Sequence, residues 1–464
     1  MNYKKFFFII PCLLIGIHLS AQNGGIDEQT LSAMRASYDN SPATKALQTA
    51  ISGNDINKLA ANHNNPNTHD VYFSNRVNSK GITDQKSSGR CWLFTGLNVL
   101  RSKVIAKYNL SEFTFSQNYC FFYDQLEKSN LFLQAIIDTK DKDMTDKIVE
   151  WLFKNPLSDG GQFTGVVNII TKYGVVPSEA MPETNSSNNT SRMSNLISLK
   201  LREYGLQLRD MAAQGAKNKE LTDKKKEMLN TIYRMLALNL GTPPSSFTYT
   251  LKDATGKPVK TQTYTPLSFY QEFVGVDMSN YVMIMNDPTR PYYKVYEIEY
   301  DRHMYDGENW KYLNVPMDQI KQIAIASIKD STMMYFSCDV GKFLNSSTGL
   351  LDINNYDYAS LMGTTFNMDK KQRIATFASG SSHAMTLCAV DLDENGNSKK
   401  WMVENSWGSA SGYKGHLIMT DEWFDEYMFR LVADKKYIPK DIQALLTQKP
   451  VILPPWDPMF AMEE

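Results

Sequence analysis

Side chains far apart along the chain have the types needed for acyl transfer through a thiol. Cys91 lies in QKSSGRCWLF (85–94), where small and polar residues give way to an apolar run. If a helix begins there, the positive end of its dipole favours the thiolate of Cys91, which is the reactive form of a cysteine. Such a nucleophile also needs an imidazole as general acid, and hydrogen-bond donors for the oxyanion that forms on the attacked carbonyl.

His383 is the histidine that best fits the acid and base role. It follows small residues and opens SHAMTLCAVDL (382–392), a strand-like segment, which predicts an imidazole at the end of a sheet. A histidine at such a place is more often structural than catalytic, so His383 alone does not decide the chemistry. The other histidines outside the N-terminal apolar run lie in a polar arm, a predicted loop and a predicted strand: His63, His69, His303 and His416.

Asn405 and Gln85 can supply the remaining functions. Asn405 lies in VENSWG (403–408), and its side-chain oxygen can accept a hydrogen bond from the imidazole and hold its orientation. Trp407, in the same segment, can shield that bond from water. Gln85 precedes Cys91 in the sequence and can donate its amide N–H to an oxyanion, beside the backbone N–H of the nucleophile.

Several motifs occur in a fixed order along the chain: QKSSGRCWLF, LNVLR (97–101), DGGQF (159–163), GVVPSEAMPET (174–184), SHAM, VENSWG and PWDPM (455–459). Together they resemble the papain-like cysteine peptidases, and within these the branch of bleomycin hydrolases and bacterial aminopeptidases C. The resemblance spans the chain from about residue 70 onward. It implies a nucleophilic Cys91, with His383 as acid and base. Asn405 would orient the imidazole, and Gln85 would bind the oxyanion.

The resemblance also implies substrate contacts and partners. Gly160 and Gly161 match glycines that let the backbone of a peptide substrate lie against the cleft wall, and Trp407 belongs to the same substrate-binding region. In this branch the C-terminal tail lies in the active-site cleft, where its carboxylate, here that of Glu464, holds the free amine of the substrate. The tail departs from the family pattern at Phe460. In this branch a helical hairpin also mediates a homohexamer whose active sites face the interior, and the resemblance implies the same assembly here.

The pattern of elements predicts an α+β fold. Apolar residues at helical spacing follow Cys91, and strand-like segments dominate from residue 245 onward. With the resemblance, this indicates a papain-like fold that has a helical lobe, a β-barrel-like lobe and an inserted helical hairpin. The expected divisions are a signal peptide (1–21), an N-terminal arm (22–80), a helical catalytic lobe that carries the nucleophile (81–193), a helical hook (194–244), a β-rich lobe that carries His and Asn (245–449) and a tail that enters the active-site cleft (450–464).

The N-terminus has the layout of a signal peptide. Lys4 and Lys5 precede an apolar run, and Ser20 and Ala21 are small residues before a polar stretch. We place cleavage after Ala21; a lipoprotein anchored through Cys12 is the weaker alternative. No later stretch is apolar over a length that could span a bilayer. The chain is therefore expected to be exported, periplasmic or secreted, and free of the membrane after the signal is removed.

Composition disfavours several other classes of protein. A net charge of −1 gives no general attraction to nucleic acids. Five cysteines in 464 residues do not form a disulfide scaffold, and the sequence has no CxxC pair or HExxH motif. We therefore expect no metal. The resemblance implies no organic cofactor, and peptides as substrates.

Three functions fit these observations. The leading interpretation is a cysteine aminopeptidase that removes N-terminal residues from peptides through a Cys-His-Asn thiolate and an acyl-enzyme. The alternatives are an endopeptidase of the same fold and a non-catalytic, ring-forming scaffold or binding protein. The presence of Cys91, His383 and Asn405 disfavours the last of these.

Overall fold

The computed structural model describes residues 24–65, 70–77 and 80–460. The chain divides into two compact units, one that ends at Ala61 and one that begins at Asn62. The predicted signal peptide (1–21) and Glu464 lie outside the described residues.

The first unit contains part of the predicted arm. Its helices are α1 (Glu28–Ser37), α2 (Pro42–Gly53) and α3 (Ile56–Ala60). Each begins after an acidic or hydroxyl side chain that accepts a hydrogen bond from a backbone N–H of the first turn, namely Asp27, Ser41 and Asp55. No residue of α1 or α2 is buried. Capping and helix propensity, rather than a core, therefore define these two helices.

A mixed sheet runs through the second unit. Its strands are β1 (Asn75–Arg76), β4 (Tyr281–Met285), β5 (Lys294–Ile298), β6 (Lys311–Asn314), β7 (Met334–Cys338), β8 (Leu344–Asn345), β9 (Leu350–Leu351), β10 (His383–Leu392), β11 (Ser398–Glu404), β12 (His416–Thr420), β13 (Met428–Asp434) and β14 (Val451–Leu453). In the described chain their order is β14-β5-β6-β4-β13-β7-β10-β11-β12-β9-β8, and β1 pairs with β10. β10 and β11 pair antiparallel and are joined by a short turn, so they form a hairpin.

The two faces of the sheet pack against different helices. On β7, Tyr335 belongs to one apolar core, whereas Met334 and Phe336 belong to the other. α4 (Cys91–Tyr108) packs on β10 and β7 and shares the core of Tyr335. α12 (Met317–Lys329) packs on β13 and β10 and shares the other core. The sheet is thus covered on both faces, and α4 is fixed against the strand that begins with His383.

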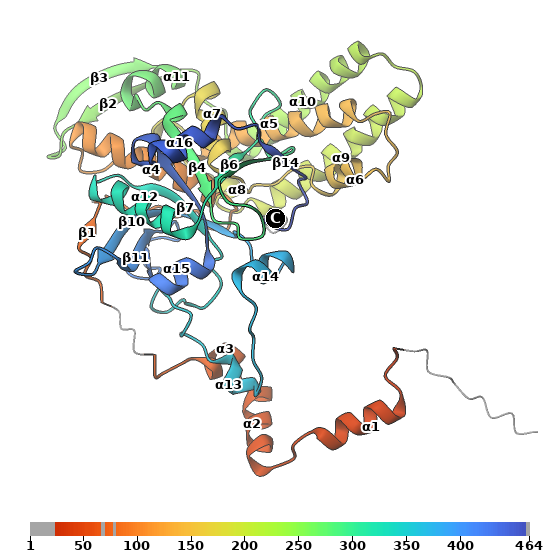
Figure 1. Ribbon diagram of the computed structural model, residues 1–464. Helices are drawn as coiled ribbons and strands as arrows, with labels where there is room; N and C mark the ends of the chain where they lie inside the picture. The colour runs from red at the N-terminus through yellow and green to blue at the C-terminus, as the bar shows by residue number, and fades with distance from the viewer. Residues whose placement is uncertain (1–23, 66–69, 78–79, 461–464) are drawn as a thin grey trace, which may run out of the picture. The chain divides into compact units, whose positions relative to one another are not determined.

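Helices dominate the sequence between α4 and residue 240. They are α5 (Gln117–Asp138), α6 (Lys147–Lys154), α7 (Phe163–Tyr173), α8 (Asn185–Asn188), α9 (Ser191–Ala213) and α10 (Asn218–Leu240). α9 and α10 form a long pair that packs along α5 and extends outward in Figure 1. The polar segment TNSSNNTS (184–191) contains α8, which begins where Thr184 and Ser187 form a capping box.

The remaining elements are short. They are η1 (Ser178–Ala180), β2 (Phe247–Lys252), β3 (Pro258–Tyr264), α11 (Pro266–Ser268), η2 (Phe269–Val274), η3 (Met278–Asn280), α13 (Tyr358–Met362), α14 (Lys370–Ala375), α15 (Asp421–Tyr427), η4 (Lys435–Tyr437), α16 (Lys440–Ala444) and η5 (Leu445–Thr447). Helices concentrated before residue 245 and strands after it confirm the predicted α+β class. Across the described ranges, no helix combines the length and the apolar character that a membrane span requires.

Candidate active site

Cys91 is the first residue of α4, which confirms the predicted helix start. Arg90, its neighbour in sequence, points away from the thiol. The Arg90 guanidinium pairs with Glu183 at 2.9 Å and lies over the rings of Phe94 and Phe121. This cation therefore anchors the chain at the point where the helix begins.

His383 opens β10 and bonds to Asn405, as the sequence predicts. Nε2 of His383 lies 2.8 Å from Oδ1 of Asn405, and the backbone N–H of Ser406 donates to the same oxygen at 2.8 Å. A backbone N–H can only donate, so this atom of Asn405 is the amide oxygen, and Nε2 must carry the proton that it shares with it. A neutral imidazole in this position has its acceptor at Nδ1.

Two further contacts define the surroundings of the imidazole. The ring of Trp407 stacks on that of His383 with centroids 4.8 Å apart and an interplanar angle of 28°. The backbone amide of Ala384 faces the thiol of Cys91. The first contact fits the predicted shielding by Trp407. The second places the nucleophile next to the strand residue that follows His383.

Burial controls the protonation of both groups. It raises the pKa of the Cys91 thiol above its ordinary value, although the backbone amides of Ala384 and Trp92 act in the opposite direction. Burial also lowers the pKa of His383 to about 4, against the effect of its bond to Asn405. The stabilisation of the thiolate that the helix start predicts is thus opposed by burial of the thiol. Burial favours the neutral form of each of the two groups.

Gln85 is buried close to the nucleophile and is held at both ends of its amide. Nε2 donates to the carbonyl oxygen of Ser88 at 2.7 Å, and Oε1 accepts from the hydroxyl of Ser406 at 2.6 Å. Because a carbonyl can only accept, these partners fix which end of the amide is nitrogen. One of the two N–H bonds of Nε2 goes to Ser88, and the second is available for an oxyanion.

The glycines predicted to line the cleft lie in the loop between α6 and α7. A Cβ on Gly161 would come within 2.2 Å of the ring of His303 and 2.9 Å of Trp92. Gly161 therefore has a packing reason to be glycine, independent of any contact with substrate. The carbonyl of Gly160 accepts a hydrogen bond from Lys128. Glu464 lies outside the described residues, so its predicted role remains a prediction.

Sequence reasoning missed a buried ionic contact near this loop. His303, which we predicted to lie in a loop, is in one, but its Nδ1 is 2.5 Å from Oδ1 of Asp124, 179 residues away in sequence. Nothing local to either residue signals the pairing.

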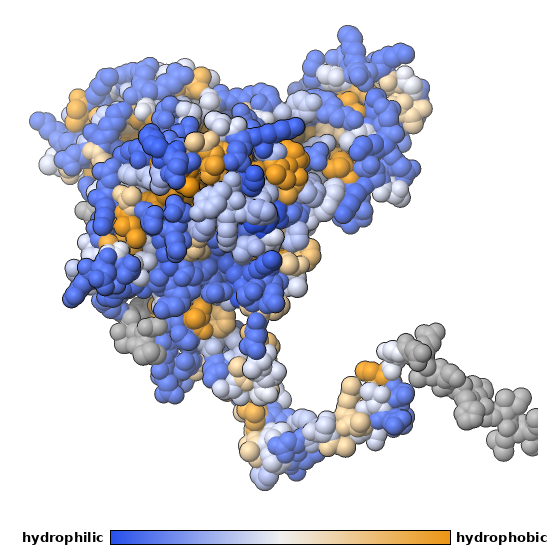
Figure 2. Space-filling view, in the orientation of Figure 1, coloured by the Kyte–Doolittle hydropathy of each residue, from blue (hydrophilic) through white to orange (hydrophobic). Residues whose placement is uncertain are grey.

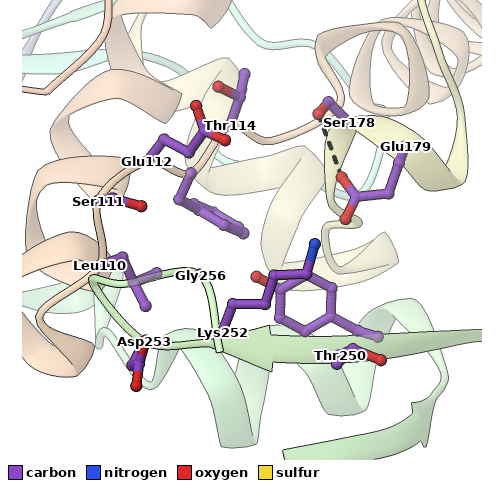
Figure 3. A pocket seen from close by; sticks show the side chains of 12 residues that line it. Leu110, Ser111, Glu112, Thr114, Ser178, Glu179, Thr250, Lys252, Asp253 and Gly256 are labelled. Carbon is purple, nitrogen blue, oxygen red and sulfur yellow. Dashed lines mark hydrogen bonds between the residues drawn. The ribbon is translucent and has the colours of Figure 1, made fainter. Parts of the chain in front are cut away.

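Other features of the described chain are separate from the thiol site. No group of three or more His, Cys, Asp or Glu side chains among the residues placed by the structure is arranged to hold a metal. A polar hollow of about 460 Å³ lies between the loop that follows α4 and the strand β2 (Figure 3). Glu112, Glu179 and Lys252 line it, and no predicted catalytic residue does.

Comparison with known proteins places this site in a family. Residues 25–460 match the Peptidase C1-like family. The chain belongs to this family. It is 39% identical to mouse bleomycin hydrolase, over 95% of this chain and all of that protein. It is 36% identical to aminopeptidase C of Lactobacillus delbrueckii subsp. lactis, over 94% of this chain and 98% of that one.

A solved structure extends the comparison to the fold. The crystal structure of PepW from Lactobacillus rhamnosis superposes with a TM-score of 0.90 at 35% sequence identity, over 94% of this chain and 99% of that one. The predicted papain-like fold and the resemblance to bleomycin hydrolases and aminopeptidases C are confirmed. The enzyme class, a cysteine aminopeptidase, is confirmed as well. The role of each site residue stays a prediction that the geometry supports.

The geometry of Gln85 gives a first prediction. Gln85→Ala will lower kcat by roughly ten- to a thousandfold, the usual effect of one lost oxyanion donor, and will change KM less. Ser406→Ala will lower kcat by a smaller factor, because it removes only the bond that holds Oε1. Steady-state kinetics on an aminoacyl coumarin amide measure both effects. Gln207→Ala, on the exposed side of α9, is the matched control. An unchanged kcat in Gln85→Ala would show that this amide does not bind the oxyanion.

Proposed function

We propose that the chain is an exported aminopeptidase that hydrolyses N-terminal residues from peptides through a Cys91–His383–Asn405 mechanism. The observation that carries this proposal is the pair of bonds to Oδ1 of Asn405. They assign the proton to Nε2 of His383 and leave Nδ1 as the acceptor, one residue before Ala384, whose backbone amide faces the thiol of Cys91. This is the tautomer that a Cys-His pair needs before attack.

The steps follow from these positions. The proton of the Cys91 thiol moves to Nδ1 of His383, and the sulfur attacks the carbonyl carbon of the first peptide bond. The resulting oxyanion accepts hydrogen bonds from Nε2 of Gln85 and from the backbone N–H of Cys91. The imidazolium gives its proton to the leaving amine, so the C–N bond breaks and an acyl-enzyme forms. Water then loses a proton to the imidazole and attacks the acyl carbon. The C–S bond breaks, the acid leaves, and the imidazolium returns its proton to the sulfur, which restores the thiol.

A pair of matched substrates tests the proposal. The purified protein, in a reducing buffer, is given an aminoacyl coumarin amide with a free amine and the same compound with an N-acetyl group. We expect turnover of the first and refusal of the second. Equal turnover of both would indicate an endopeptidase. Turnover of neither, in a protein that still reacts with iodoacetamide at Cys91, would favour the non-catalytic scaffold.

The described part of the C-terminal tail supports the predicted exopeptidase specificity. β14 pairs with β5, and Asp457 forms a two-point ion pair with Arg290 at 2.9 and 3.0 Å. Phe460 is buried with its ring against that of Trp310 at a centroid distance of 4.9 Å. The guanidinium of Arg430 lies 5.9 Å from the centroid of the Phe460 ring. We propose that the tail continues from this docked position toward Cys91 and limits the cleft.

We also propose that the hook assembles the chain into a homohexamer. Within α9 and α10, apolar side chains are exposed among polar ones (Figure 2): Leu196, Leu199, Leu206, Tyr233 and Leu238. A contiguous exposed apolar patch marks a surface that another protein covers, and we propose that these side chains form one. Light scattering of the full chain should give the mass of six copies, and deletion of 194–244 should give smaller species. A monodisperse monomer of the full chain would refute the assembly.

Export rests on the N-terminal segment alone. The two lysines, the apolar run and the small residues before Gln22 support removal of residues 1–21 by a signal peptidase. N-terminal sequencing of protein recovered from the extracytoplasmic fraction should begin at Gln22. An intact Met1 in protein found only in the cytoplasm would contradict export.

A further inference from the structure

A buried ionic cluster lies beneath the glycine loop and has no part in the mechanism above. Asp124, on α5, is fully buried, and its two oxygens meet three donors. Oδ1 is bound by Nδ1 of His303, and Oδ2 lies 3.0 Å from Nζ of Lys128 and 3.0 Å from Nε2 of Gln125. Asp124 accepts only, so His303 carries its proton on Nδ1. Lys128 and the carboxylate compensate each other's charge, which a buried ion requires.

The ring of His303 packs closely against Trp92 and two glycines. The edge of its ring meets Trp92 with centroids 4.6 Å apart and an interplanar angle of 71°. A Cβ on Gly161 or on Gly165 would lie 2.2 Å from the same ring. The imidazole is therefore wedged between the helix of the nucleophile and the loop that leads into α7. Its segment lies between β5 and β6, so it joins the sheet to the helical lobe.

Two of the donors that meet at Asp124, Lys128 and Gln125, also hold the loop. Nζ of Lys128 donates to the carbonyl of Ser158 at 3.0 Å and to that of Gly160 at 2.6 Å. Nε2 of Gln125 donates to the carbonyl of Ser158 as well, at 3.0 Å. The carbonyl between them, that of Asp159, accepts from the indole N–H of Trp92 at 2.9 Å. Three consecutive carbonyls are thus bound by side chains from the interior.

This arrangement sets the direction of the N–H groups. In a planar trans peptide the carbonyl and the following N–H point in opposite directions. Because the carbonyl of Gly160 points toward Lys128, the N–H of Gly161 points away from it. The N–H of Gly160 donates to Oγ of Ser158 within the loop at 3.0 Å, so the N–H of Gly161 is the one left to meet a peptide. We propose that Asp124, Lys128 and His303 are positioning residues that hold the loop 158–161 so that the N–H of Gly161 meets the peptide backbone in the cleft.

The proposal rests on the proposed function, because it assigns a role in binding peptide to a loop beside Cys91. It separates two groups of residues: one that makes the nucleophile and one that makes the wall against which a peptide lies. Loss of the second group should weaken the positioning of substrate and leave the reactivity of the thiol intact.

Two variants test this separation. Lys128→Met removes the donors to Ser158 and Gly160. The double variant Asp124→Asn/Lys128→Met removes both charges, so no unpaired ion stays buried, and it carries the test if the single variant fails to fold. Lys154→Met, which breaks an exposed ion pair with Glu150, is the matched control. We expect KM for a free aminoacyl coumarin amide to rise about tenfold in both test variants, with kcat changed less than about threefold.

The rate of alkylation by iodoacetamide reports the reactivity of the Cys91 thiol alone, because this small reagent does not bind to the loop 158–161. This rate should stay within about twofold of that of the parent protein in all three variants. An unchanged KM in the double variant, even with a lowered melting temperature, overturns the proposal and leaves the cluster a structural role only. A rise in KM with an equal fall in alkylation also overturns it, because the cluster then acts on the nucleophile. Failure of the parent protein to turn over substrate would instead count against the proposed function.

Discussion

Cys91→Ala will abolish turnover of peptides with a free amine, and the variant will remain folded. In the proposed mechanism the sulfur forms the acyl-enzyme, and loss of a nucleophile of this kind costs about five to six orders of magnitude in kcat. Cys91 is only partly buried, at the first position of α4, so removing one atom leaves a small void and the helix keeps its start. Steady-state kinetics with an aminoacyl coumarin amide and thermal unfolding measure the two outcomes.

The same experiment needs a control for loss of a thiol. Cys388, on β10, is fully buried, and its sulfur donates to the carbonyl of Met402. Cys388→Ala should lower stability and leave kcat close to that of the parent. His383→Ala should be nearly as damaging as Cys91→Ala, and Asn405→Ala milder, since Asn405 orients the imidazole. Activity of the parent level in purified Cys91→Ala would falsify the assignment of the nucleophile.

The parts of the site that could be predicted are those with a local signal. The change from small to apolar residues at Cys91 indicates a helix start, and α4 begins there. Small residues before an alternating segment indicate a strand that opens with His383, and β10 does so. The bond from His383 to Asn405 was predictable because a short hairpin joins their strands and brings the two segments together.

The parts that could not be predicted depend on distant residues. The helix dipole at Cys91 is a local effect, whereas the burial that raises the pKa of its thiol depends on the fold around it. The pairing of His303 with Asp124 joins a loop between two strands to a helix early in the chain, and neither sequence context is unusual. Ser406 holds Gln85 through a contact between segments 321 residues apart. Such contacts follow from the tertiary fold, which periodicity does not specify.

Removal of Phe460–Glu464 will change the specificity from aminopeptidase toward endopeptidase. Asp457 and Phe460 dock the tail: the first is bound twice by Arg290, and the second is buried against Trp310. The proposed end of the tail places negative charge in the cleft, where it attracts a free amine and blocks longer chains. The measured quantity is the ratio of kcat/KM for an N-acetylated peptide to that for the free peptide, and it should rise about tenfold or more.

Phe460 departs from the family pattern and yet is buried, so it anchors the tail. The contribution of this anchor can therefore be separated from that of the acidic end. Deletion of residues 461–464 alone keeps this anchor and removes only the acidic end, whereas Asp457→Asn weakens the docking and keeps the whole tail. If the charge selects the substrate, the shorter deletion should raise the ratio as much as the longer one. If docking matters as well, Asp457→Asn should raise it by a smaller factor.

Turnover of the free peptide and the melting temperature, each compared with the parent protein, show whether a variant is damaged in general. An identical ratio in the parent and in both deletions would show that the tail does not select the free amine, and specificity would then have to come from the cleft around Gly160 and Gly161.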